Sequence, residues 1–168
     1  ELEQGLPGTP LEPRYQPNPY SPPADQKPMA EGQSKFLGSV CCGNQAVNFT
    51  SYFNQVVPEN AGKWASVEAE RDVYNWDGLD EAVALAEANG FVFRYHVLVW
   101  GSQQPDWIAN LSVDEQREEI REWFEQVANR YGDRIDYLEV ANEFISQPPC
   151  LKTQGHGGYI EALGTACV

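Results

Sequence analysis

The fold class is decided by one stretch of the sequence, Phe91-Val-Phe-Arg-Tyr-His-Val-Leu-Val-Trp100, in which only Arg94 and His96 interrupt an apolar run. A strand of a parallel sheet has this composition when helices bury both of its faces. The residues before it predict a helix, since Asp77 is a favourable N-cap and Gly90 supplies a left-handed stop. A helix followed directly by a buried strand indicates an α/β fold with a parallel sheet.

The same alternation of short apolar runs and helical segments extends to both sides of this stretch. It predicts three further strands, at 36–42, 55–58 and 135–141, and a short helix at 47–54. A second long helix begins at Ser112, which forms a capping box with Glu115, and ends at Gly132. The buried faces of the two long helices are expected to be Leu79, Ala82, Val83 and Ala86 in the first, and Val113, Ile120, Phe124, Val127 and Tyr131 in the second.

Composition excludes several classes of function. With 25 acidic residues against 11 basic ones, the formal net charge is -14. We therefore expect no nucleic-acid partner and no membrane partner, because binding nucleic acids or anionic membranes depends on clustered basic residues. No apolar run approaches the roughly 20 residues that cross a bilayer. The 168 residues also fall short of the about 250 that a complete eight-stranded α/β barrel requires.

The chain divides into two regions by its proline content. Residues 1–33 contain eight of the twelve prolines and are interpreted as either a Pro-rich linker to another module or a disordered leader. Residues 34–168 carry the β/α alternation and are expected to form the folded domain. The start at Glu1, without a signal segment, suits a processed secreted protein and equally a recombinant fragment. We expect an extracellular protein.

The cysteines and histidines do not suggest a metal site. Four cysteines, at 41, 42, 150 and 167, include no CxxC pair, and only two histidines are available as further zinc ligands. No metal and no other cofactor is expected. Cys150 and Cys167 flank a glycine-rich loop and are candidates for a disulfide in an oxidising compartment. The adjacent Cys41 and Cys42 are expected to point to opposite faces of a strand and not to bond to each other.

Polar side chains accompany the ends of three successive apolar strands. They are Glu59 and Asn60 after the second strand, His96, Trp100 and Gln103 in and beyond the third, and Asn142 and Glu143 after the fourth. Ligands of parallel α/β folds bind at the carboxyl ends of the strands, where the loops converge. Carboxylates, amides and a histidine near Trp64, Trp100 and Trp107 suit a neutral, hydroxyl-rich ligand with apolar ring faces, which describes a carbohydrate. Core packing is the alternative role for at least one of the five tryptophans.

Three blocks of the sequence resemble the first signature blocks of glycoside hydrolase family 10, the endo-β-1,4-xylanases. They are Phe53-Asn-Gln-Val-Val-Pro-Glu-Asn-Ala-Gly-Lys-Trp64, Arg94-Tyr-His-Val-Leu-Val-Trp-Gly-Ser-Gln103 and Leu138-Glu-Val-Ala-Asn-Glu143, in the order and spacing of the family. The resemblance implies an α/β fold of the (β/α)8 TIM-barrel type. Residues 34–168 would be its amino-terminal half, about the first four βα units. The implied activity is hydrolysis of xylan with retention of anomeric configuration.

The resemblance also implies a role for each matching residue. Glu143 would be the general acid/base, and Asn142 would contact the sugar 2-hydroxyl. Glu59, Asn60 and Lys63 would hold the sugar in the glycone subsite beyond the cleavage point, and His96, Trp100 and Gln103 would line the subsite next to it.

Two departures from the family pattern stand out. The family often has a histidine where this chain has Gly101, so one contact near the catalytic carboxylates is absent or replaced. The family nucleophile lies in a later Thr-Glu-Leu-Asp-like block that this chain lacks, and Glu161 is a poor substitute because it resembles the loop after the fourth strand. We therefore expect a second polypeptide or a missing carboxyl-terminal half to complete the barrel. A non-catalytic carbohydrate-binding half-barrel and a related β-1,4-glucanase stay open as alternatives.

Overall fold

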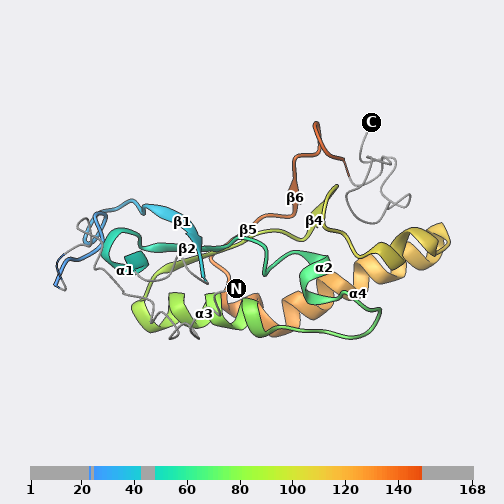
Figure 1. Cartoon of the computed structure of the whole chain (residues 1–168), viewed down its shortest axis with the longest axis horizontal. Helices are drawn as coiled ribbons and strands as arrows, with labels where there is room; N and C mark the ends of the chain where they lie inside the picture. Colours follow the sequence, from blue (N-terminus) through green and yellow to red (C-terminus); the bar gives the residue numbers. More distant parts are fainter. Residues whose placement is uncertain (1–22, 24, 43–47, 149–168) are drawn as a thin grey trace, which may run out of the picture.

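The computed structural model describes residues 23, 25–42 and 48–148, and its central feature is a parallel sheet (Figure 1). The sheet has four strands in the order β1-β2-β3-β5, so that each strand lies beside the next strand of this sheet along the chain. The strands are β1 (Gly38–Cys41), β2 (Gln55–Pro58), β3 (Val92–Tyr95) and β5 (Tyr137–Leu138). Two further strands, β4 (Val99–Trp100) and β6 (Ala141–Asn142), form a second parallel pair. The predicted α/β class is confirmed.

The third and fourth predicted strands are each divided into two. The third is divided into β3 and β4, and the fourth into β5 and β6. The segment that joins β3 to β4 lies beside the segment that joins β5 to β6, since Leu98 N donates to Glu139 O and Val99 N donates to Val140 O. The peptide bond between His96 and Val97 is cis. The prediction of continuous strands over 91–100 and 135–141 is wrong. An apolar run indicates that a segment is buried, but it does not show that the hydrogen-bond ladder is unbroken.

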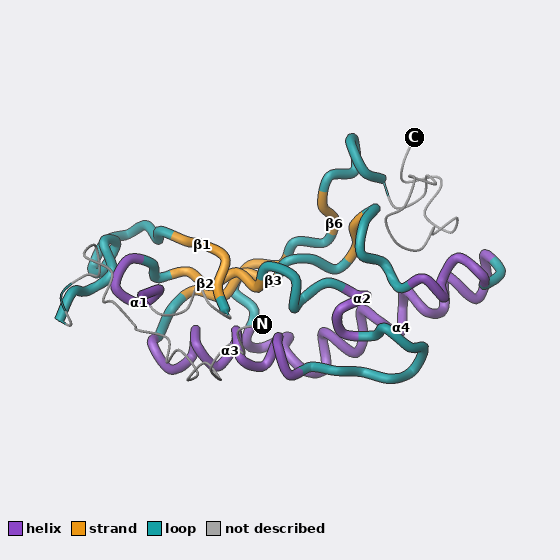
Figure 2. Tube along the Cα trace, in the orientation of Figure 1, coloured by secondary structure: helices purple, strands orange, loops and turns teal. Residues whose placement is uncertain are grey.

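Two long helices, α3 (Asp77–Asn89) and α4 (Val113–Tyr131), run along the same side of the sheet (Figure 2). The helix expected at 47–54 is shorter than predicted and forms α1 (Phe49–Tyr52). Three elements were not predicted: α2 (Trp64–Val67) and the 3-10 helices Asp106–Asn110 and Gly132–Arg134. Elements of about one turn are too short to produce a periodic pattern of apolar residues.

The helix ends follow the predictions closely, with one correction. Gly90 ends α3 in the left-handed conformation, with φ of 64°. The N-cap of α3 is Trp76 and not Asp77, because the side chain of Asn75 accepts the hydrogen bond from Asp77 N at 3.1 Å. The capping box that begins α4 at Ser112 is present as predicted.

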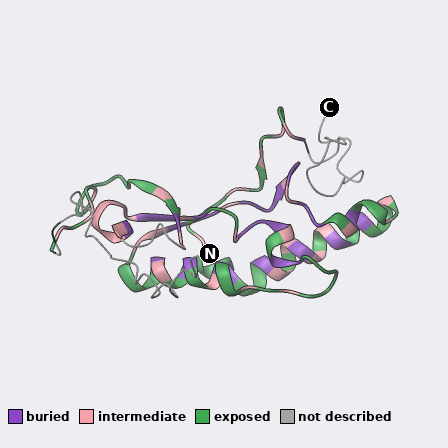
Figure 3. Ribbon diagram, in the orientation of Figure 1, coloured by how far each residue is buried: buried purple, intermediate pink, exposed green. Residues whose placement is uncertain are grey.

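The core lies between the sheet and the inner sides of the helices (Figure 3). All four predicted residues of α3 are buried. In α4 the predicted Val127 and Tyr131 are buried, but Val113, Ile120 and Phe124 are only half-buried. Their places are taken by Gln116, Glu119 and Trp123. Two of these are polar and find partners inside the protein, since Gln116 donates to Ile108 O and Glu119 accepts from Arg71. A stripe chosen by hydrophobicity alone misses such residues.

The prediction for the adjacent cysteines is wrong, since Cys41 and Cys42 form a disulfide with each other. β1 ends at Cys41, and Cys42 has a positive φ of 89°. The alternation of side chains along a strand therefore does not extend to Cys42. The candidate pair Cys150 and Cys167, like Glu161, lies outside the described residues.

The two outer strands of the sheet expose large apolar side chains. These residues lie in or beside β1, and in the segment from β5 to just beyond β6: Phe36, Leu37, Val40, Tyr137, Leu138, Val140 and Ile145.

At the amino-terminal side, Met29 N donates to Tyr52 O and Gln26 donates to Ser51 O. The division of the chain at residue 34 stays a prediction. In the part of the chain that the structure describes, no helix is long and apolar enough to span a membrane.

Candidate active site

Lys63 is the centre of a polar cluster beyond the carboxyl end of β2. The residue is almost buried, and its ammonium group donates to Asn60 Oδ1 at 2.9 Å and to Gln103 Oε1 at 2.6 Å. The same ammonium nitrogen lies 4.4 Å from the ring centroid of Trp100, in a cation-π contact. Gln103 also donates to Asn60 at 3.3 Å. Residues from two successive strand-to-helix connections are thus held together without a ligand.

The electrostatics of this cluster are set by Lys63 and two carboxylates. Burial lowers the pKa of the Lys63 ammonium group, and the nearby carboxylates of Glu59 and Glu143 oppose that shift. Glu59 is exposed and follows β2 directly. The charge is therefore held in place by the amide oxygens of Asn60 and Gln103 and by the ring face of Trp100.

Glu143 follows β6 directly and presents an exposed carboxyl group. One oxygen, Oε2, accepts two hydrogen bonds: from Trp100 Nε1 at 2.8 Å and from Gln147 Nε2 at 3.1 Å. The backbone of Glu143 is left-handed, with φ of 50°, and that of Gln103 is too, with φ of 56°. Strained non-glycine residues of this kind concentrate at functional sites.

His96 and Asn142 lie apart from the Lys63 cluster, in an open hollow of about 350 Å³. Nδ1 of His96 lies 3.0 Å from Oε2 of Glu139, and Arg94 donates to the same oxygen at 2.5 Å. Glu139 was not predicted as a site residue. It could have been predicted from the spacing of Arg94 and His96. Two residues apart in a strand, they lie on one face of it, where an acidic residue of the neighbouring strand can pair with both.

The expectation that Trp64 faces a ligand is wrong, and nothing tests the same expectation for Trp107. Trp64 is 1% exposed, stacks on Trp123 with 5.6 Å between ring centroids, and donates its N–H to Glu68 at 2.7 Å. Trp107 packs edge-on against Trp64 and is half-buried. Trp100 alone of these three joins the polar cluster. The alternative role of core packing is confirmed for Trp64.

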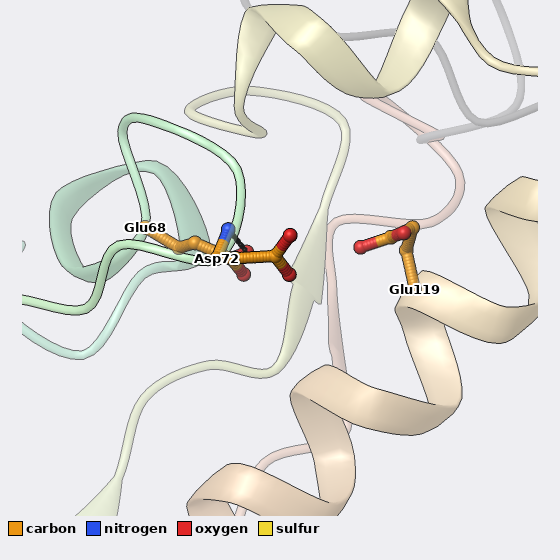
Figure 4. Close-up of side chains that lie close together, drawn as sticks. All are labelled: Glu68, Asp72 and Glu119. Carbon is orange, nitrogen blue, oxygen red and sulfur yellow. Dashed lines mark hydrogen bonds between the residues drawn. The ribbon is translucent and has the colours of Figure 1, made fainter.

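A group of three carboxylates lies on the helix side of the molecule, formed by Glu68, Asp72 and Glu119 (Figure 4). Oxygen atoms from the three side chains lie within 4.8 Å of one another. Glu68 accepts from Trp64 and from Asp72 N, and Arg71 pairs with Glu119. Burial raises the pKa of Glu68. Since these partners account for the two buried carboxylates, the group is a structural one and no evidence for a metal ion.

The sequential order of parallel strands, the helices on one side and the polar side chains at the strand ends define part of a (β/α)8 barrel. The model for Glycosyl hydrolase family 10 matches residues 29–167, and the chain belongs to this family.

Its relatives include Endo-1,4-beta-xylanase B of Cellvibrio japonicus, which is 42% identical over 112 residues, or 66% of this chain and 18% of that protein. Endo-1,4-beta-xylanase 3 of Hypocrea jecorina is 37% identical over 100 residues, or 59% of this chain and 29% of that protein. A solved structure, the glycosylated endo-beta-1,4-xylanase of Gloeophyllum trabeum, superposes with a TM-score of 0.62 at 27% identity, covering 73% of this chain and 42% of that one. The chain therefore spans less than half the length of these relatives.

Proposed function

We propose that this chain supplies the amino-terminal half of a retaining endo-β-1,4-xylanase, with Glu143 as the general acid/base. The observation that carries the proposal is the placement of the Glu143 carboxyl at the carboxyl end of β6, where Trp100 and Gln147 both donate to one of its oxygens. Such a group has one defined orientation toward a substrate, as proton transfer requires. The endo-1,4-beta-xylanase relatives support the same reaction.

The reaction needs a second carboxylate about 5 to 5.5 Å from the first. Glu143 protonates the leaving glycosidic oxygen while the second carboxylate attacks the anomeric carbon and forms a covalent glycosyl-enzyme. Glu143 then takes a proton from a water molecule, which releases the sugar with its configuration retained. Asn142 donates to the 2-hydroxyl, a hydrogen bond that strengthens as the oxocarbenium ion develops.

The Lys63 cluster holds the sugar on the glycone side of the bond that is cleaved. Glu59, Asn60 and Lys63 bind its hydroxyl groups, while His96, Trp100 and Gln103 line the subsite next to the cleavage point. Because Lys63, Asn60 and Gln103 already bond to one another, the subsite is organised before the substrate arrives.

The nucleophile and the rest of the barrel come from a carboxyl-terminal half, either the continuation of this chain or a second polypeptide. Among the described residues, β1 and β5 have no strand partner on their outer sides, and both expose apolar side chains. This supports the step, since such surfaces are normally covered. We call this chain together with its carboxyl-terminal half the completed barrel. The completed barrel is extracellular, where xylan is found, and residues 1–33 are its linker or leader.

The test is the variant Glu143→Gln in the completed barrel. Hydrolysis of xylan should fall by roughly 10²–10⁴-fold, the usual contribution of a general acid/base. Glu118→Gln, which changes an exposed carboxylate on α4, is the matched control and should retain full activity. Unchanged hydrolysis in Glu143→Gln would refute the assignment.

Two further outcomes separate the alternatives. Binding of xylo-oligosaccharides by the completed barrel with no hydrolysis at all would favour a carbohydrate-binding module. Faster cleavage of soluble cellulose than of xylan would favour a β-1,4-glucanase.

The isolated chain should associate with itself or with the carboxyl-terminal half in sedimentation experiments. A monomer that unfolds cooperatively would contradict the proposed open edges.

A further inference from the structure

We infer that Gln147 is a positioning residue for Glu143, that it leaves Oε1 of Glu143 as the oxygen that carries the transferred proton, and that Gly101 is the residue that allows Gln147 to reach it. This inference rests on the proposed role of Glu143 as the general acid/base.

A single turn of backbone brings Gln147 back to Glu143. Glu143 O accepts from Ser146 N at 3.0 Å and from Gln147 N at 2.7 Å, which closes the loop over residues 143–147. The side-chain amide of Gln147 then donates to Glu143 Oε2 at 3.1 Å. Backbone and side chain of Gln147 thus both bond to the same residue, so the position of the amide is fixed relative to the carboxylate.

Gly101 is buried directly beside this turn. A β-carbon on Gly101 would lie 1.9 Å from the backbone oxygen of Gln147 and 2.8 Å from the carbonyl carbon of Pro148. Both are backbone atoms, so any side chain at 101 would push the 143–147 turn away from β4. Gly101 follows Trp100, the other donor to Glu143. The absence of a side chain at 101 therefore allows both donors to converge on one carboxylate oxygen.

The convergence of two donors assigns different roles to the two oxygens of Glu143. In a protonated carboxyl group one oxygen carries the hydrogen and the other acts only as an acceptor. Trp100 Nε1 and Gln147 Nε2 both donate to Oε2, so Oε2 is the acceptor in both protonation states and the proton resides on Oε1. In the first step this proton moves from Oε1 to the leaving glycosidic oxygen as its bond to the anomeric carbon breaks. In the second step Oε1 takes a proton from the attacking water.

The effect of losing Gln147 should depend on the leaving group. Gln147→Met keeps the length of the side chain but removes the donor, and the carboxyl group becomes free to rotate. For xylo-oligosaccharides, whose leaving group must be protonated, kcat/KM should fall roughly tenfold, as expected for one hydrogen bond to a charged group. For 2,4-dinitrophenyl β-xylobioside, whose leaving group departs without a proton, kcat/KM should not change, because this quantity reports the first step only.

Three variants of the completed barrel complete the test. Gly101→Ala should show the same split between substrates, since it displaces Gln147. Gln147→Glu, which keeps the size but places a carboxylate against Glu143, should show a larger loss on xylo-oligosaccharides than Gln147→Met. Gln126→Met on α4 is the matched control and should leave both substrates unaffected.

Equal losses on both substrates, or no loss on either, would overturn the inference. Glu143→Gln distinguishes the two levels of failure. If Glu143→Gln abolishes xylan cleavage while the Gln147 and Gly101 variants show no split, the positioning role is wrong and the proposed function stands. If Glu143→Gln has no effect either, the proposed function itself fails.

Discussion

Replacing Trp64 by Phe tests whether this residue belongs to the core or contacts sugar. Trp64 is 1% exposed, stacks on Trp123 and donates its N–H to Oε2 of Glu68. Phe retains a ring in the stack but cannot donate. Glu68 is also 1% exposed, so water cannot replace the lost hydrogen bond. The variant therefore leaves a buried carboxylate oxygen without its partner.

The magnitude follows from two contributions. The smaller ring loses packing worth about 1–2 kcal/mol, toward the lower end of large-to-small core substitutions. The unsatisfied carboxylate oxygen adds about 1–3 kcal/mol. The sum of about 2–5 kcal/mol corresponds to a fall in the Tm of the completed barrel, which has about 250 residues or more, of roughly 4–10 °C.

The penalty should depend on pH through Glu68. Burial raises the pKa of Glu68 and the hydrogen bond from Trp64 lowers it, so removing that bond raises the pKa further. A carboxyl group whose pKa is raised by folding favours the folded state at low pH and loses that contribution as the pH rises through its folded pKa. The Trp64→Phe variant should therefore lose more stability at about pH 7 than at about pH 4.

The assay is thermal unfolding followed by far-UV circular dichroism, together with KM for xylan. Trp107→Phe is the matched control, because Trp107 is half-buried and donates to the backbone oxygen of Glu68 at 3.2 Å. It should cost less than Trp64→Phe and show a weaker dependence on pH. An unchanged Tm with a raised KM in Trp64→Phe would refute the core assignment and restore Trp64 as a sugar contact.

Three smaller predictions concern other parts of the fold. The Arg130 hydrogen bond lowers the pKa of Asp80, so this pair between α4 and α3 should stabilise the fold above about pH 4 and lose its effect as the pH falls below the folded pKa. Because the pair is partly exposed, Asp80→Asn should cost well under about 1 kcal/mol by chemical denaturation, and a cost that does not shrink at high salt would contradict the ion pair. Ser112→Ala should destabilise the completed barrel by about 1 kcal/mol in the same assay through loss of the α4 cap, whereas Ser112→Thr should cost little. Iodoacetamide should label Cys41 and Cys42 only after reduction, as read by peptide mass, and labelling without reductant would exclude their disulfide.

The predicted site and the observed site agree where the sequence pattern reflects topology. The ends of parallel strands meet at one edge of a sheet, and this rule anticipated that Asn60 and Gln103 would be close in space. Lys63, which bonds to both, was expected only from the family resemblance. It could not anticipate that Gln147 contacts Glu143, because that contact depends on a tight turn and on the space beside Gly101.

Two of the wrong predictions have the same physical cause, which is that the type of a residue does not show which partners its side chain will have. A tryptophan such as Trp64 looks the same in the sequence whether its ring stacks on a sugar or on another tryptophan. Glu119 is charged and was left out of the predicted buried face of α4, yet its ion pair with Arg71 allows it to be buried there. The disulfide between Cys41 and Cys42 was not expected because strand geometry was assumed for Cys42, whereas β1 ends at Cys41.

The order of the sheet has a consequence for synthesis of the protein. β2 pairs with β1, β3 with β2 and β5 with β3, so every strand meets a partner that left the ribosome before it. Pairing between strands that are neighbours in the sheet and in sequence keeps the loops to be closed shorter than another order of the same parallel strands would. The described sheet can therefore grow strand by strand during translation, and β5 is the last strand added to it.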